Sequence, residues 1–171
     1  MRQRGFTLIE ILVTVVIIGI MVAGVMISGG LAFNDRHLDT ERDRILVIAD
    51  HLRDQAALQN REYGLRIYDG GYQFMTFDVR QRLWHDGGDE LLRARKLPKG
   101  ITMKLWIEGR PVTLPEAEVE PDELAPQILL YSSGDLSLFE LEIRREAGDG
   151  VRIAPSTDGT TLMETQLEAE R

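Results

Sequence analysis

One carboxylate, that of Glu10, stands near the start of a long apolar run that continues to Phe33. Residues 11–33 carry no charged side chain, and a charge inside a membrane-spanning helix costs about 2.5–3.5 kcal/mol on insertion scales. A lone carboxylate in lipid can pair with a cation, because opposite charges stabilise each other strongly in a medium of low dielectric constant. Glu10 is therefore a candidate functional residue, and its chemistry is ion pairing.

A short basic segment, Arg2-Gln3-Arg4-Gly5, comes directly before Phe6 and the apolar run. One alternative is an ordinary secretory signal peptide cut near Ser28-Gly29-Gly30. Its apolar region would be only 7–15 residues long, and Glu10 would be out of place there. A second alternative is a plain single-span anchor, which explains the length and orientation of the run. It does not explain why Gly5 and Phe6 are combined with Glu10.

This N-terminus resembles the type IV prepilin signal of pilins and of the pseudopilins of type II secretion. The resemblance implies that prepilin peptidase cleaves between Gly5 and Phe6 and methylates the new amino group of Phe6. It also implies that Glu10 pairs with the amino-terminal charge of a neighbouring subunit during assembly. On this reading the chain is a substrate of an enzyme and is not itself an enzyme.

The apolar run must lie in a helix if it is to position Glu10. As a helix, residues 11–33 would span roughly 34 Å, enough to cross a bilayer core of roughly 30 Å. Basic residues precede the run and acidic residues follow it, so the N-terminus stays in the cytoplasm and the head enters the periplasm. We expect a leader at 1–5, the transmembrane half of the helix at 6–33, its amphipathic half at 34–60, and a periplasmic β-rich head at 61–171.

The amphipathic half carries one apolar stripe at helical spacing, on which the head is expected to pack. The stripe comprises Leu38, Ile45, Ile48, Ala49, Leu52 and Ala56. After Asn60 the apolar period shortens to that of strands. Strands are predicted at 63–68 and 72–77 in one hairpin, at 101–107, at 127–131 and 136–144 in a second hairpin, and at 151–154 and 161–167. One long helix packed on antiparallel sheets gives an α+β fold.

Several short segments of the head follow in an order that sharpens the resemblance. They are Arg61-Glu62-Tyr63-Gly64, Tyr72-Gln73-Phe74, Trp84, Leu97-Pro98-Lys99-Gly100 and Ile128-Leu129-Leu130-Tyr131-Ser132-Ser133-Gly134-Asp135. The chain resembles the H-type minor pseudopilin of the type II secretion system, a family shared with FimT/FimU-like minor pilins. This implies a pilin-like α/β roll and a structural role in the pseudopilus, assisting export of folded periplasmic proteins across the outer membrane. The alternative is a minor type IV pilin that acts in pilus assembly or DNA uptake.

The resemblance also implies partners and a location. The partners are other major and minor pseudopilins, prepilin peptidase and the inner-membrane assembly platform. The subunit would be a single-pass protein of the bacterial inner membrane that is assembled into the periplasmic pseudopilus. The formal net charge of −8 argues against nucleic acid as a partner, and loss of Arg2 and Arg4 would leave 18 basic against 28 acidic side chains.

The remaining residues indicate no catalytic site, cofactor or metal centre. His37, His51 and His85 lack metal-ligand spacing, the chain has no Cys, and Ser132-Ser133-Gly134 is best explained as a turn. This speaks against a membrane-tethered periplasmic enzyme. One acidic cluster, Asp86, Asp89 and Glu90, and a second at 116–123 are interpreted as solvated loops rather than calcium sites. The Pro- and Glu-rich stretch 111–126 is expected to be a mobile connection between strands.

Two tryptophans are the candidate interface residues of the head. Trp84 is predicted in a loop, and Trp106 on the outward face of the strand 101–107. The inward face of that strand is predicted to carry Ile101, Met103, Leu105 and Ile107. Trp is enriched at the centres of protein interfaces. The alternative is that both side chains pack in the core of the head.

Overall fold

The computed structural model describes residues 8–86, 88–117, 124–146 and 148–169, and for residues 23–35 it describes the backbone alone. Gly5, Phe6 and the rest of the predicted leader lie outside the described residues. The contacts within the chain separate two compact units, Met1–Arg36 and His37–Arg171.

One helix, α1 (Leu8–Gln59), contributes to both units. It ends where Asn60 adopts a left-handed backbone with φ of 51°, which Asn tolerates better than most residues. The N–H of Arg61 then donates to the carbonyl oxygen of Ala56 at 3.2 Å. This is the six-to-one hydrogen bond that closes a Schellman motif, so the polar Asn60 stops the helix and turns the chain toward the first strand.

The part of α1 from His37 onward presents the predicted apolar stripe to the core of the head. All six stripe residues are buried, from Ala56 at 0% exposed to Ile48 at 6%. One charged residue shares this face, because Glu41 lies three residues beyond Leu38 and is 6% exposed. The amphipathic stripe predicted from the sequence is confirmed.

The first antiparallel sheet is built on one hairpin. It contains β1 (Tyr63–Tyr68), β2 (Gly71–Asp78), β3 (Leu83–His85), β4 (Arg95–Lys96) and β7 (Ile128–Leu130). Its order is β3-β2-β1-β7, and β4 also pairs with β2. The predicted hairpin of β1 and β2 is confirmed, with Tyr68 opposite Gly71 and Gly70 at φ of 76° in the turn.

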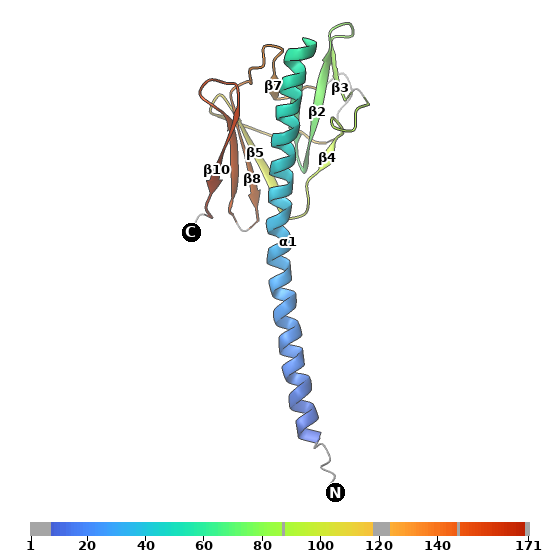
Figure 1. Ribbon diagram of the computed structural model, residues 1–171, viewed down its shortest axis with the longest axis vertical. Helices are drawn as coiled ribbons and strands as arrows, with labels where there is room; N and C mark the ends of the chain where they lie inside the picture. Colours follow the sequence, from blue (N-terminus) through green and yellow to red (C-terminus); the bar gives the residue numbers. More distant parts are fainter. Residues whose placement is uncertain (1–7, 87, 118–123, 147, 170–171) are drawn as a thin grey trace. The chain divides into compact units, whose positions relative to one another are not determined.

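The second antiparallel sheet holds the remaining strands, β5 (Ile101–Ile107), β6 (Arg110–Val112), β8 (Phe139–Arg145), β9 (Gly150–Pro155) and β10 (Leu162–Leu167). Its order is β10-β9-β8-β5-β6. Alternation in β5 is as predicted up to Leu105, because Ile101, Met103 and Leu105 are buried while Thr102 and Lys104 are exposed. It is not seen at the end of the strand, where Trp106 and Ile107 are both half-buried. In Figure 1, β8 and β10 lie on one side of the second part of α1, and β2, β3 and β4 lie on the other.

The second predicted hairpin, at 127–131 and 136–144, is wrong. Its two strands belong to different sheets, since β7 pairs with β1 whereas β8 pairs with β5 and β9. Between them only the bridge of Leu130 with Leu136 forms, around a turn closed by the N–H of Tyr131 and the carbonyl of Asp135 at 2.9 Å. The turn predicted at Ser132-Ser133-Gly134-Asp135 does form. The two strands on either side of it pair with distant strands instead of with each other, so the chain crosses from one sheet to the other at this turn.

The Pro- and Glu-rich stretch is not a loose connection where it is described. Arg66 is 2% exposed and donates to the carbonyl oxygen of Glu116 at 2.7 Å. The side-chain amide of Gln127 exchanges two hydrogen bonds with the backbone of Ile67, at 2.8 and 3.0 Å, as a neighbouring strand would. The expectation of a mobile connection is therefore wrong for the part of the stretch before residue 118, and residues 118–123 lie outside the described part.

Candidate functional site: the first helix and the surface of the head

The first unit exposes an apolar helix with one carboxylate. From Leu8 to Val22 every described side chain is exposed, including Leu8 at 84%, Val15 at 61% and Met21 at 67%. Only Glu10, Thr14 and Gly19 interrupt the apolar sequence of this segment. The Thr14 hydroxyl donates a hydrogen bond to the carbonyl oxygen of Glu10 at 2.7 Å. Glu10 lies in the first turn of α1. A helix that is apolar on all sides requires another apolar phase or other helices around it.

Within the described part of the chain, no helix is both long and apolar enough to cross a membrane. The predicted span at 6–33 includes residues 6, 7 and 23–33, whose side chains lie outside that part. The transmembrane half of the helix stays a prediction, as do the processing roles of Gly5 and Phe6.

Trp84 lies in the short strand β3 and not in a loop, so that prediction is wrong. The strand pairs with β2, which places Trp84 opposite Phe77 with ring centroids 5.1 Å apart and ring planes tilted by 51°. Cross-strand aromatic pairs of this kind stabilise a sheet, which explains why three residues suffice to form an edge strand. Trp84 stays half-buried and lies outside the hydrophobic core.

Trp106 lies in β5 on the predicted outward face, opposite Glu140 of β8 and Pro111 of β6. It is half-buried and does not belong to the core cluster. The two tryptophans are in different sheets, because Trp84 belongs to the sheet of β2 and Trp106 to the sheet of β8. They therefore provide two separate candidate contacts and not one patch, and their interface role stays a prediction.

A buried polar cluster joins α1 to β2, and the sequence reading missed it. The Tyr72 hydroxyl donates to Glu41 Oε2 at 2.7 Å, and Arg44 donates to Glu41 Oε1 at 2.5 Å. Burial, followed by the hydrogen bond to Glu41, raises the pKa of Tyr72, so the phenol stays protonated and remains a donor. The signal was present in the spacing, because Glu41 falls in phase with Leu38, Ile45 and Ile48.

A second ion-pair cluster covers the outward face of the sheet that contains β8. Glu142 is 3% exposed, and it accepts hydrogen bonds from Arg144 at 2.8 Å and from Arg152 at 2.7 Å. Burial alone would raise the pKa of Glu142, but the hydrogen bonds from these two arginines outweigh it and the pKa is lowered. The register places Glu142 directly beside Lys104 and Arg152 on neighbouring strands. This cluster was also missed, because its members are brought together by strand order.

The histidines and acidic residues form no metal centre among the described residues. No group of three or more His, Cys, Asp or Glu side chains is arranged to hold a metal ion there. His51 shares a hydrogen bond with Gln55 at 2.9 Å on α1, and His85 lies half-buried in β3. In the first acidic cluster, Asp86 and Asp89 cap the backbone N–H groups of Gly88 and Leu91. Of the second cluster, residues 118–123 lie outside the described part.

Comparison with known proteins decides among the pilin-like families. Residues 1–26 match the prokaryotic N-terminal methylation motif. The chain is 33% identical over 169 residues to the type II secretion system protein H of Pseudomonas aeruginosa, and the match covers 96% of each chain. The chain belongs to the protein H family of the type II secretion system. This minor pseudopilin is also 32% identical over 154 residues to protein H of Aeromonas hydrophila, covering 86% of this chain and 84% of the relative.

Solved structures agree with this assignment at the level of the fold. The crystal structure of the minor pseudopilin EpsH from the type II secretion system of Vibrio cholerae matches with a TM-score of 0.62 and 18% identity, covering 80% of this chain and 98% of that one. The solution structure of GspH from Escherichia coli matches with a TM-score of 0.54 and 15% identity, covering 80% and 91%. The predicted α+β pseudopilin fold is confirmed.

The family fixes the general role of this minor pseudopilin. It is a pilin-like subunit that takes part in type II protein secretion, and its family is structural rather than enzymatic. Membership and the N-terminal motif imply assembly with other pseudopilins, processing by prepilin peptidase and a membrane-anchored place in the periplasmic pseudopilus. The alternative of a pilus or DNA-uptake subunit is not the one that these relatives support.

Proposed function

We propose that this minor pseudopilin enters the pseudopilus from the inner membrane as a single-pass protein whose head lies in the periplasm. In the fibre its head contacts other minor pseudopilins and assists the export of folded periplasmic proteins across the outer membrane. The observation that carries this proposal is the exposed surface of residues 8–22, which is apolar except at Glu10, Thr14 and Gly19.

The apolar surface of residues 8–22 must be shielded from water both before and after assembly. Before assembly, lipid covers the aliphatic side chains of the helix, and the helices of other pseudopilins replace the lipid in the fibre. Glu10 restricts how the helix can pack in the fibre. A carboxylate in a low-dielectric phase is stabilised by a cation at a matching depth, so the helix is held where such a cation is present. The methylated amino group of Phe6 on a neighbouring subunit is the proposed cation. Cleavage between Gly5 and Phe6 is needed to create it.

The head acts in this proposal as a contact surface and not as an enzyme. Its most buried described carboxylates, Glu41 and Glu142, are already held by Tyr72 and by arginines, so they stabilise the sheets instead of awaiting a substrate. The proposed partners are the major and minor pseudopilins, prepilin peptidase and the inner-membrane assembly platform. No cofactor, metal or nucleic acid is required.

A deletion strain tests the proposal. Removing the gene should abolish or strongly reduce export of type II cargo while folded cargo accumulates in the periplasm, and the full-length chain supplied in trans should restore export. Twitching and DNA uptake in the same strain serve as the control and should be unchanged. Normal cargo export with defective twitching or transformation would instead assign the chain to a type IV pilus.

A further inference from the structure

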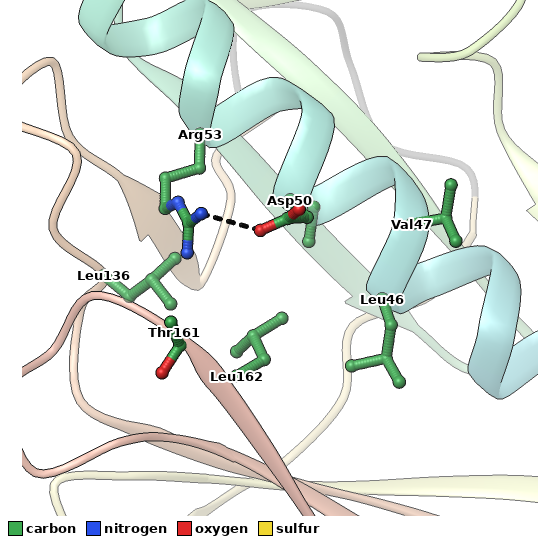
Figure 2. A pocket seen from close by; sticks show the side chains of 8 residues that line it. Leu46, Val47, Asp50, Arg53, Leu136, Thr161 and Leu162 are labelled. Carbon is green, nitrogen blue, oxygen red and sulfur yellow. Dashed lines mark ion pairs between the residues drawn. The ribbon is translucent and has the colours of Figure 1, made fainter.

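A groove of about 380 Å³ lies between α1 and β10 in the head. Figure 2 shows Leu46, Leu136 and Leu162 directed toward this space, while Val47 lies at its outer rim. The other lining residues are Ala49, Asp50, Arg53 and Thr161. The floor of the groove is therefore aliphatic, and it opens on a side of the head where Val47 is 68% exposed.

Two arginine contacts join α1 to the region of β10 on either side of the groove. Arg42 of α1 lies 3.6 Å from the carboxylate of Glu164 on β10, and Arg53 donates to the carbonyl oxygen of Thr160 just before that strand. Leu46 and Leu162 lie between these two bridges and stay half-exposed. Leu46 and Leu162 pack against the core, and the space between α1 and β10 remains open beside them. The groove is thus already formed in the free head, which lowers the cost of binding.

Asp50 lines the groove, and further carboxylates lie near it on α1 and β10. Five carboxylates share two guanidinium groups, with Asp39, Asp43 and Glu164 around Arg42, and Asp50 and Asp54 around Arg53. The carboxylates are also more exposed to solvent than the arginines. The five carboxylate side chains are 45–66% exposed, whereas the two arginines are only 18% and 19% exposed. A partner that approaches the groove therefore meets negative charge around an aliphatic floor.

We infer that this groove is the docking surface for another pseudopilin of the same fibre, through an aliphatic side chain flanked by Lys or Arg. The aliphatic group enters between Leu46 and Leu162, and the flanking cations meet Asp43, Asp50 and Asp54. A second copy of this chain fits poorly, because two acidic rims would face each other on a protein whose formal charge is −8. This inference rests on the proposed function and specifies its partner surface.

The chain offers a matched pair of positions for a test in cells. Val47 at the groove and Val79 in the turn after β2 are both exposed valines, at 68% and 74%. A photo-crosslinking amino acid at each position of the full chain, in cells that carry the complete secretion system, reports what lies against it. We expect position 47, and not position 79, to crosslink to another pseudopilin through a peptide that contains Lys or Arg beside an aliphatic residue. A crosslink to a second copy, or equal crosslinking at both positions, would overturn the inference.

A charge-introducing variant supplies the energetic test. Val47→Lys puts a cation at the rim of the groove, where it repels a basic partner and removes an aliphatic contact, so recovery of co-expressed pseudopilins with the full chain should fall about tenfold. Val79→Lys should leave recovery unchanged, and thermal melts should show both variants folded. Asp54→Lys should weaken the association further when combined with Val47→Lys. Undiminished recovery with Val47→Lys would exclude the groove as the contact.

The failure of this inference can be told apart from failure of the proposed function. If Val47→Lys has no effect while deletion of the gene still blocks cargo export, the subunit works in secretion but docks elsewhere. If deletion of the gene leaves export intact, the proposed function itself is wrong and the inference falls with it.

Discussion

The hydroxyl of Tyr72 donates a hydrogen bond to Glu41 Oε2 at 2.7 Å, and both residues are buried between α1 and β2. A carboxylate thus lies within the otherwise apolar stripe of the helix. Arg44 occupies its other oxygen, so the charge is compensated at the edge of the core. The relationship fixes the rotation of α1 against the first sheet, because a turned helix would leave a buried carboxylate without its donors.

Tyr72→Phe should lower the free energy of unfolding by about 1–3 kcal/mol, because it leaves one oxygen of a buried carboxylate unsatisfied. Chemical denaturation of the full chain in detergent measures this. Tyr63→Phe is the matched control, since the Tyr63 hydroxyl donates to Gln55 at the longer distance of 3.3 Å and should matter less. Equal effects of the two variants would show that the Glu41 contact does not hold the helix.

The pH dependence of stability should include a contribution from Glu142. Its pKa in the folded head lies below its ordinary value of 4.5, because the hydrogen bonds from Arg144 and Arg152 outweigh burial. A group with a lowered folded pKa adds stability that is fully present above about pH 4.5 and is lost as the pH falls through the folded pKa. The unfolding free energy, followed from pH 6 to pH 3, should therefore fall less steeply in Glu142→Gln than in the parent.

Glu140→Gln is the control for that titration. Glu140 belongs to the same strand and lies 3.4 Å from Arg152, but its side chain is 45% exposed. Its replacement should change the free energy of unfolding little, because an exposed ion pair contributes little. Parallel curves for the parent and Glu142→Gln would contradict the coupling of Glu142 to the two arginines.

Processing is predicted to begin the mature chain at a methylated Phe6. Intact mass and N-terminal sequencing of protein from a strain with active prepilin peptidase measure this, and a strain without the peptidase is the control. Gly5→Val should block the cut, because a bulky side chain replaces glycine at the cleaved bond. A mature chain that starts near Leu31 would indicate an ordinary signal peptide and would end the assembly proposal for Glu10.

Glu10→Ala should impair assembly without affecting the fold of the head. Glu10 belongs to the unit Met1–Arg36, whereas the buried core lies in His37–Arg171, so the thermal melt of the head should not change. Co-purification with other pseudopilins and export of cargo should both decrease. Thr14→Val, one turn away, is the control and should behave like the parent. Full export with Glu10→Ala would refute the ion-pairing role.

The two tryptophans are predicted to anchor separate contacts with other minor pseudopilins. Trp84→Ala or Trp106→Ala should weaken the affinity of the full chain for a partner by about 2 kcal/mol or more where the residue lies at the centre of an interface. Titration calorimetry of detergent-solubilised subunits measures this, with Tyr131→Ala as an exposed aromatic control. If both variants bind like Tyr131→Ala, the tryptophans serve only the stability of their sheets.

Local patterns were enough to predict much of this protein from its sequence. The strands at 63–68 and 101–107, the hairpin around Gly70 and the apolar stripe from Leu38 to Ala56 all depend on periods of two to four residues, which neighbouring residues encode directly. The N-terminal motif and its family could also be recognised, because cleavage and membrane insertion act on contiguous sequence.

Only the tertiary structure decided which distant elements meet. It placed β7 and β8 in different sheets. It also showed that Trp84 lies in a strand, where it packs on Phe77, and that the segment around Glu116 contacts Arg66. It also brought Glu41 to Tyr72, and left a groove between α1 and β10 beside the contacts of Arg42 and Arg53. These outcomes depend on burial and charge compensation among residues that are far apart in the sequence. A local sequence pattern carries no information about which distant residues come into contact.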